Sequence, residues 1–213
     1  MVGKEKLKTI LIWLGQKPKK NSKKHVYIYD YQDLTNYSKK NFELHPYYNA
    51  KGKLAGYATR KSLRNLNLIS KAAHVFVFNK KGELFLQRRA PTKDLYPNLI
   101  APSASGHVDI NETSKQAAVR ELKEELGVHQ EPLFLGKIKC FTPQLKEFLD
   151  VFILITDSKI TINKTEISEG FFIPFEEIYT KQRFSEYIPA MKKELRIFKT
   201  QIKKKINQLK KEE

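Results

Sequence analysis

The sequence of 213 residues contains one cysteine, Cys140, so no disulfide bond can form within the chain. Long apolar runs are also lacking. The longest near the start, Ile10–Leu14, is too short to span a bilayer and is not followed by the small-residue cleavage site of a signal peptide. These features exclude an internally disulfide-stapled scaffold, and we expect a cytoplasmic protein.

Acidic residues are scarce: 23 Asp and Glu stand against 40 Lys and Arg, which leaves a formal net charge of +17. The excess lies mostly at the ends, with +7 in residues 1–24 and +6 in residues 192–213. Most of it is Lys, whereas Arg is the residue suited to bidentate recognition of phosphates and bases. Two interpretations stay open: solvated Lys-rich ends, or nonspecific binding of nucleic acid or an anionic surface through the termini.

Hydrophobic periodicity predicts strands on both sides of one strongly marked helix, an order that is typical of an α/β sandwich with a mixed sheet. We expect a basic N-terminal extension (1–45), a central domain (46–188) and a Lys-rich C-terminal helix (189–213). The apolar stripe of that last helix can cover its own domain or a partner, so a homodimer stays open. The expected elements are helices over 4–15, 113–126 and from Pro189 on, a turn or short helix over 61–70, a hairpin over 47–60 and strands over 25–29, 72–79, 82–89, 99–106, 133–141, 148–156 and 171–175.

The helix expected over 113–126 carries three acids on one side. Glu121, Glu124 and Glu125 have the i, i+3, i+4 spacing that places side chains on a common face. Carboxylates packed this closely repel one another unless a cation lies among them, and hard divalent cations take oxygen ligands. Taken alone, the segment also fits an ordinary solvated Glu/Lys helix face.

The flanking residues favour the metal site. Residues 106–128 fit the pattern G-x5-E-x7-R-E-U-x-E-E-x-G-U, with U an aliphatic residue, at every fixed position. From average residue usage, a chance match in a chain of this length has a probability below about 1 in 10^6. The stretch resembles the Nudix box, the signature of the Nudix hydrolase superfamily. This resemblance implies a Nudix-type α/β/α sandwich whose loop–helix–loop binds Mg2+ or Mn2+.

The resemblance also implies which acids take part in the chemistry. Glu121, Glu124 and Glu125 would be both metal ligands and catalytic residues. An acid outside the box often serves as the base or as an extra ligand in this superfamily. Glu147, at the start of the strand expected over 148–156, is the candidate for that catalytic role.

Four other positions of the box would be structural. Glu112 and Arg120 would pair and brace the loop against the helix. Gly106 would allow a tight turn that brings a backbone carbonyl close to the metal. Gly127 is placed to end the helix.

Three segments outside the box, 49–60, 82–98 and 167–178, resemble the isopentenyl-diphosphate isomerase-like branch of the superfamily. In that branch Arg89 and Lys93 match basic residues that grip the substrate diphosphate. A strand end and its adjoining loop can aim both cations at phosphate near the metal. Arg88 should point to the opposite face of its strand.

The chain departs from the true isomerases at several positions. Their catalytic Cys is Ser105 here, and two upstream histidines of their metal site match Leu63 and Ser70. His107 and Glu147 are retained, and His107 becomes a candidate substrate-binding residue. The isomerases have lost part of the R-E-U-x-E-E segment, whereas this chain retains all of it. The intact segment favours hydrolysis over isomerisation.

The remaining histidines suggest no site. His25, His45 and His129 have no ligand spacing, and His74 lies among apolar strand residues, where a satisfied, half-buried side chain is the expected state.

The sequence therefore predicts a metal-dependent pyrophosphohydrolase that cleaves a nucleoside diphosphate or a related small diphosphate compound. Two alternatives stay open: an isopentenyl-diphosphate delta-isomerase, and a nucleotide-sensing or RNA-binding Nudix protein that uses the basic ends. The leaving group is undetermined, because specificity loops in this superfamily vary.

Overall fold

The computed structural model describes residues 10–11, 26–29 and 44–209. Its strands are β1 (Ile10–Leu11), β2 (Val26–Tyr29), β3 (Leu44–Tyr48), β4 (Leu54–Thr59), β5 (Ile69–Phe78), β6 (Glu83–Arg89), β7 (Ile100–Ala101), β8 (Ala104–His107), β9 (Leu133–Phe141), β10 (Lys146–Ile155) and β11 (Ile167–Pro174). Its helices are α2 (Arg60–Asn65), α3 (Ser114–Leu126), α4 (Lys181–Ser185) and α5 (Pro189–Leu209), with a 3-10 turn, η1, at Phe175–Tyr179.

The strand β5 is the central strand of a mixed sheet. It pairs in parallel with β10 and antiparallel with β3, β6 and β8. On the far side of β10 the sheet ends in the antiparallel strand β9. The predicted mixed sheet is confirmed, with the apolar strand β10 in its interior.

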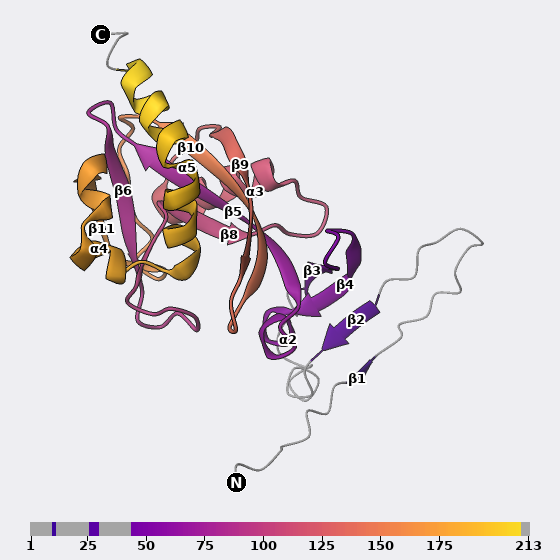
Figure 1. Ribbon diagram of the computed structural model, residues 1–213. Coiled ribbons are helices and arrows are strands. Elements are labelled where there is room, and N and C mark those ends of the chain that lie inside the picture. Colours follow the sequence, from indigo (N-terminus) through magenta and orange to yellow (C-terminus); the bar gives the residue numbers. More distant parts are fainter. Residues whose placement is uncertain (1–9, 12–25, 30–43, 210–213) are drawn as a thin grey trace.

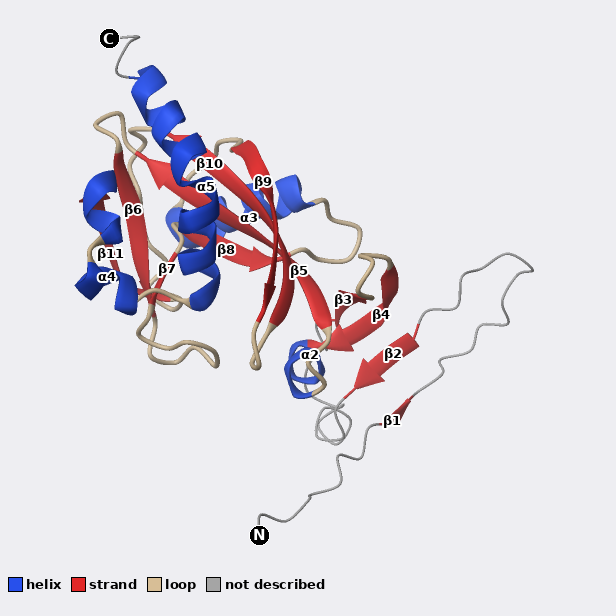
Figure 2. Ribbon diagram, in the orientation of Figure 1, coloured by secondary structure: helices blue, strands red, loops and turns tan. Residues whose placement is uncertain are grey.

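Helices cover both faces of this sheet, with α5 on one side and α3 on the other (Figures 1 and 2). Side chains alternate along a strand, so the two faces of β5 contribute to different hydrophobic cores. Phe76 and Phe78 pack in the core between the sheet and α5, and Val75 and Val77 pack in the core between the sheet and α3. Each helix buries its apolar stripe against one face. The α/β/α sandwich expected from the sequence is therefore confirmed.

The C-terminal helix α5 packs on its own domain. Met191, Leu195 and Ile202 are fully buried in the core beneath it. The ring of Phe198 lies so close to Gly136 of β9 that a Cβ at this glycine would stand 2.5 Å from it. The apolar stripe thus faces the sheet, and it no longer argues for a homodimer.

The helix α3 has well-defined ends. Thr113 and Gln116 form a reciprocal capping box at its start, as the sequence predicts. Gly127 ends it in the left-handed region with φ 67°. Both ends are thus set by local sequence, which holds the acidic face in a defined register.

Several expectations about elements are wrong. The helix expected over 4–15 is a strand at Ile10–Leu11, which pairs antiparallel with β2; the rest of that span lies outside the described residues. Helical spacing over so few residues does not outweigh an available strand edge. The strand expected over 99–106 is split in two at Pro102 and Ser103.

Two short helical elements, η1 and α4, follow β11 and were not expected, because five-residue turns carry too few positions for a periodic signal. No helix within the described parts of the chain is both long and apolar enough to cross a membrane.

Candidate active site

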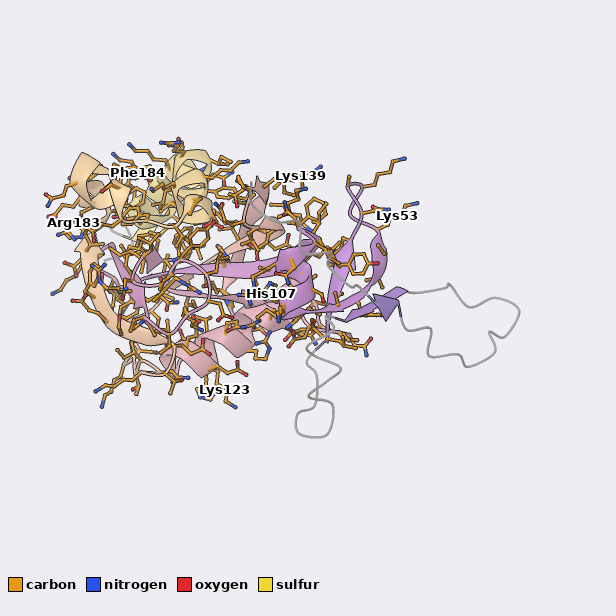
Figure 3. All side chains as sticks on the ribbon, turned by 90° about the horizontal axis from the view of Figure 1, so that it is seen from below. Lys53, His107, Lys123, Lys139, Arg183 and Phe184 are labelled. Carbon is orange, nitrogen blue, oxygen red and sulfur yellow. The ribbon has the colours of Figure 1, made fainter. Side chains whose placement is uncertain are left out.

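A cavity of about 550 Å3 opens where β5, β8 and β10 meet the helices α2 and α3. Seen from below, Figure 3 places His107 in the middle of the molecule, while Lys123 projects outward from α3. The cavity contains every sequence-predicted site residue except the structural positions Glu112 and Gly127. The predicted residues that line it are Arg89, Lys93, Gly106, His107, Arg120, Glu121, Glu124, Glu125 and Glu147.

The three acids of α3 differ in environment. Glu121 and Glu125 are buried, whereas the side chain of Glu124 is 56% exposed. Glu125 accepts hydrogen bonds from Gln87 Nε2 at 2.8 Å and from the backbone N–H of Ser105 at 3.0 Å. The carboxyl group of Glu125 is therefore held from two strands, β6 and β8.

Arg120 joins the loop before α3 to the helix. Its guanidinium binds both carboxylate oxygens of Glu112, at 2.9 and 3.0 Å, and donates to the backbone carbonyl of His107 at 2.9 Å. Burial alone would raise the pKa of Glu112, but the bonds from Arg120 and from the N–H of Asp109 hold it below its usual value. The geometry is that of a loop braced against a helix, and the structural role of the pair stays a proposal.

Gly106 lies in β8 opposite Ala73, not in a tight turn. A Cβ at this position would stand 1.7 Å from Glu121 Oε1, far inside van der Waals contact. The expected tight turn at Gly106 is therefore wrong, although a glycine is needed at this position. Glycine is required here because the carboxyl group of Glu121 occupies the space of a side chain.

Burial sets the protonation of these acids. It raises the pKa of Glu121 to about 7 and, with the neighbouring Glu121 charge, the pKa of Glu125 to about 8. Two buried carboxyl groups that resist ionisation are suited to an added positive charge. Their all-oxygen donor set is the type that hard divalent cations prefer.

The same acids are not gathered around a metal in the described part of the chain: no three His, Cys, Asp or Glu side chains there are placed to hold one as they stand. Arg120 Nη1 lies between Glu121, at 2.6 Å, and Glu124, at 3.3 Å. The guanidinium thus supplies the positive charge among them. The all-oxygen donor set fits a divalent cation, which Glu121 and Glu124 would hold in place of Arg120.

These pKa values predict that the metal-free protein loses stability between pH 7 and pH 9. A carboxyl group whose pKa is raised in the folded state stabilises the fold fully below its unfolded pKa of 4.5. This contribution is lost as pH rises through the folded pKa, which is about 7 for Glu121 and about 8 for Glu125. At about 1.4 kcal/mol per unit, the loss across this window is about 1–2 kcal/mol. Thermal unfolding at the two pH values measures it. Mg2+ should flatten the profile, and a metal-free protein that is more stable at pH 9 would contradict the assignment.

Glu147 is buried within β10, where burial raises its pKa to about 7. His107 Nε2 lies 3.6 Å from Glu147 Oε1. Burial, followed by nearby cationic groups, lowers the pKa of His107 to about 3, so this imidazole is neutral at pH 7. Glu147 thus combines a pKa near neutrality with a place in the cavity.

His45 is a cavity residue that the sequence pattern does not single out. This residue is 1% exposed in β3, and its ring centroid lies 5.0 Å from that of His107. Its Nδ1 is 3.4 Å from Asp109 Oδ1. No spacing rule finds it, because β3 reaches the cavity only through the pairing of the sheet.

The two predicted substrate-binding cations line the cavity together. Lys93 Nζ donates to Glu166 Oε2 at 2.8 Å, and Arg89 Nε donates to the backbone carbonyl of Leu95 at 3.1 Å. Arg88 binds acids on the other face of β6, as strand alternation predicts. The cavity therefore holds carboxylates and cations side by side, as binding of a metal–phosphate group requires.

Comparisons with known proteins agree with this architecture. The NUDIX domain family model matches residues 69–193. A Nudix hydrolase of Pseudomonas aeruginosa is 33% identical over 144 residues, which cover 67% of this chain and 85% of that protein. Isopentenyl-diphosphate Delta-isomerase 1 of Photorhabdus laumondii is 33% identical over 118 residues, covering 52% of this chain and 66% of that protein.

Among solved structures, a Deinococcus radiodurans protein superposes with a TM-score of 0.64 at 26% identity, covering 72% of this chain and 98% of that one. The MutT protein of Methanosarcina mazei shares the fold at a TM-score of 0.55 and 18% identity, over 62% of this chain and 94% of that one. The family match spans more than half of the sequence and includes the acidic helix and the cavity strands. The chain therefore belongs to the Nudix hydrolases.

Proposed function

We propose that this chain is a metal-dependent pyrophosphohydrolase that uses Mg2+ or Mn2+ to cleave a nucleoside diphosphate or a related small diphosphate compound. One observation carries the proposal: the buried carboxyl groups of Glu121 and Glu125 share a cavity of about 550 Å3 with Arg89 and Lys93. A cavity of this size suits a ligand as large as a nucleotide.

In the proposed reaction, Glu121, Glu124 and Glu125 would hold the metal. When bound, a divalent cation neutralises charge on the diphosphate and lowers the pKa of the attacking water. Arg89 and Lys93 bind the diphosphate oxygens and orient the scissile bond.

Glu147 accepts the proton of the water as its oxygen bonds to phosphorus and the bridging P–O bond breaks. A pKa near 7 suits a general base that works at neutral pH. The leaving group departs with the bonding electrons as a phosphate or phosphate ester. Neutral His107, beside Glu147, orients this carboxyl group or contacts the substrate.

The isomerase alternative is supported by the 33% identity to an isopentenyl-diphosphate isomerase. Against it, Ser105 stands where the isomerases carry their catalytic Cys, and its N–H is bound to Glu125. The chain's cysteine, Cys140, is buried in β9, burial raises its pKa to about 11, and it is not among the described residues lining the cavity. The site therefore offers no thiol acid to protonate a carbon–carbon double bond.

A panel of nucleoside di- and triphosphates, dinucleotides, nucleotide sugars and isoprenoid diphosphates, with Mg2+ and with Mn2+, tests the proposal. We expect metal-dependent release of phosphate or of a phosphate ester from at least one diphosphate compound. Conversion of isopentenyl diphosphate to its isomer without phosphate release would establish the alternative. Absence of hydrolysis across the panel would refute the proposed function.

A further inference from the structure

The short helix α2 forms a wall of the cavity that the proposed reaction does not use. It places two arginines, Arg60 and Arg64, among the residues that line the cavity. The two are four positions apart, so they lie on one face of the helix. Arg64 is tied to the loop carrying Lys93 by an ion pair with Asp94 at 3.0 Å. The salt bridge fixes α2 beside that loop and presents Arg60 at the same opening.

Most cations of the cavity already have an acidic partner. Lys93 pairs with Glu166 at 2.8 Å, and Arg64 and Arg120 also bind carboxylates. Across the regions that the structure describes, Arg60 and Arg89 stand apart because neither makes an ion pair. Among the described residues, neither guanidinium has a carboxylate in direct contact, although Glu125, Glu166 and Glu147 act on Arg89 from a distance. Both can therefore bind an anionic ligand directly.

The two unpaired arginines lie at different depths. Arg89 is half-buried on β6, two residues from Gln87, whose side chain holds Glu125. Arg60 is exposed at the rim. Electrostatics agree with this placement. Burial lowers the pKa of Arg89, the charges of Glu125, Glu166 and Glu147 oppose this, and Arg60 lowers it further. Arg60 also lowers the pKa of His107, after burial and His45. A substrate whose scissile diphosphate lies at the buried acids would extend its other end toward Arg60.

We propose that Arg60 binds a second anionic group of the substrate, distant from the scissile diphosphate. The favoured substrates are then diphosphate compounds that carry a further phosphate away from the scissile bond, for example on the ribose. This inference rests on the proposed function, because it takes the diphosphate to lie at the acids of α3.

A matched pair of compounds tests it: adenosine 5′-diphosphate and the same nucleotide with an added 3′-phosphate. For the wild type we expect kcat/KM about 10-fold higher for the compound with the extra phosphate, the gain of one charged hydrogen bond at an open site. Arg60→Gln should abolish this preference through KM and leave the hydrolysis of adenosine 5′-diphosphate unchanged. Arg60→Lys should restore part of it.

Arg183→Gln is the matched control, because it removes the same charge from a partly exposed arginine at the far end of the molecule from His107 (Figure 3). This variant should keep the wild-type preference. If Arg60→Gln slows both substrates equally, or if the wild type does not distinguish them, the proposal is overturned.

A binding measurement separates this inference from hydrolysis. Adenosine 3′,5′-bisphosphate and adenosine 5′-monophosphate contain no phosphoanhydride bond, so calorimetric titration reports the anion site alone. Arg60→Gln should weaken the bisphosphate about 10-fold and leave the monophosphate unaffected. Equal binding of the bisphosphate by wild type and variant, or no binding at all, would overturn the anion site even if the enzyme hydrolyses other diphosphates. Failure of the whole substrate panel, with bisphosphate binding intact, would instead count against the proposed function.

Discussion

Glu125→Gln is expected to lower turnover by about 10^2-fold or more on the best diphosphate substrate, with the fold preserved. The substitution removes a negative charge that the proposed metal requires but keeps the size of the side chain. The amide oxygen can still accept the hydrogen bonds from Gln87 Nε2 and from the N–H of Ser105. The loss should therefore appear in kcat and in metal affinity rather than in folding.

The same substitution that lowers activity should not lower the stability of the metal-free protein at alkaline pH. Burial holds the pKa of Glu125 at about 8, so ionisation of this group costs the metal-free fold stability at alkaline pH. Glu125→Gln cannot ionise, and its metal-free form should be at least as stable as the wild type at pH 9. Glu131→Gln, which removes an exposed acid, is the control for both measurements and should change neither. Full Mg2+-dependent activity in Glu125→Gln would sink the site assignment.

Glu194→Ala is expected to cost about 3–5 kcal/mol in the free energy of unfolding at pH 6. Glu194 is fully buried on α5, and its Oε1 lies 2.7 Å from Nδ1 of His74 in β5. Burial lowers the pKa of His74, but the charge and hydrogen bond of Glu194 outweigh it and raise the pKa above its usual value. Truncation of the acid would leave a buried imidazole without its counter-charge.

The pH dependence of this loss has a defined sign. A histidine whose pKa is raised in the folded state stabilises fully below its unfolded pKa of about 6.5 and loses that contribution as pH rises through the folded value. The difference between wild type and Glu194→Ala should therefore shrink between pH 6 and pH 9, as measured by chemical denaturation.

Two further variants show whether the buried pair itself is the cause. Glu131→Ala breaks an exposed ion pair with Lys115 and should cost no more than about 1 kcal/mol. The double replacement His74→Leu with Glu194→Met removes both polar groups and should recover most of the stability. A double variant as unstable as Glu194→Ala would show that packing, not the unpaired histidine, dominates the loss.

The hairpin at residues 47–60 and the strands β5 and β6 were predictable because alternating apolar residues and turn residues act locally. The strand at Ile10–Leu11 was not, because its state depends on pairing with β2 and not on its own spacing. Gly106 was identified correctly as a required glycine, yet its reason lies in the packing of Glu121 from another element. Patterns within one helix or strand can be predicted from the sequence, whereas contacts between separate elements cannot.

The sequence by itself determined the acidic face of α3, its capping box and its end at Gly127, because each depends on residues within one or two helical turns. Only the tertiary structure decided that His45 adjoins His107, that Glu194 lies buried beside His74 and that Arg60 shares a cavity with Arg89. These pairs join residues 29 to 120 positions apart in the chain, from Arg60 and Arg89 to His74 and Glu194. They meet because strands pair and helices pack over a common core, which no local spacing encodes.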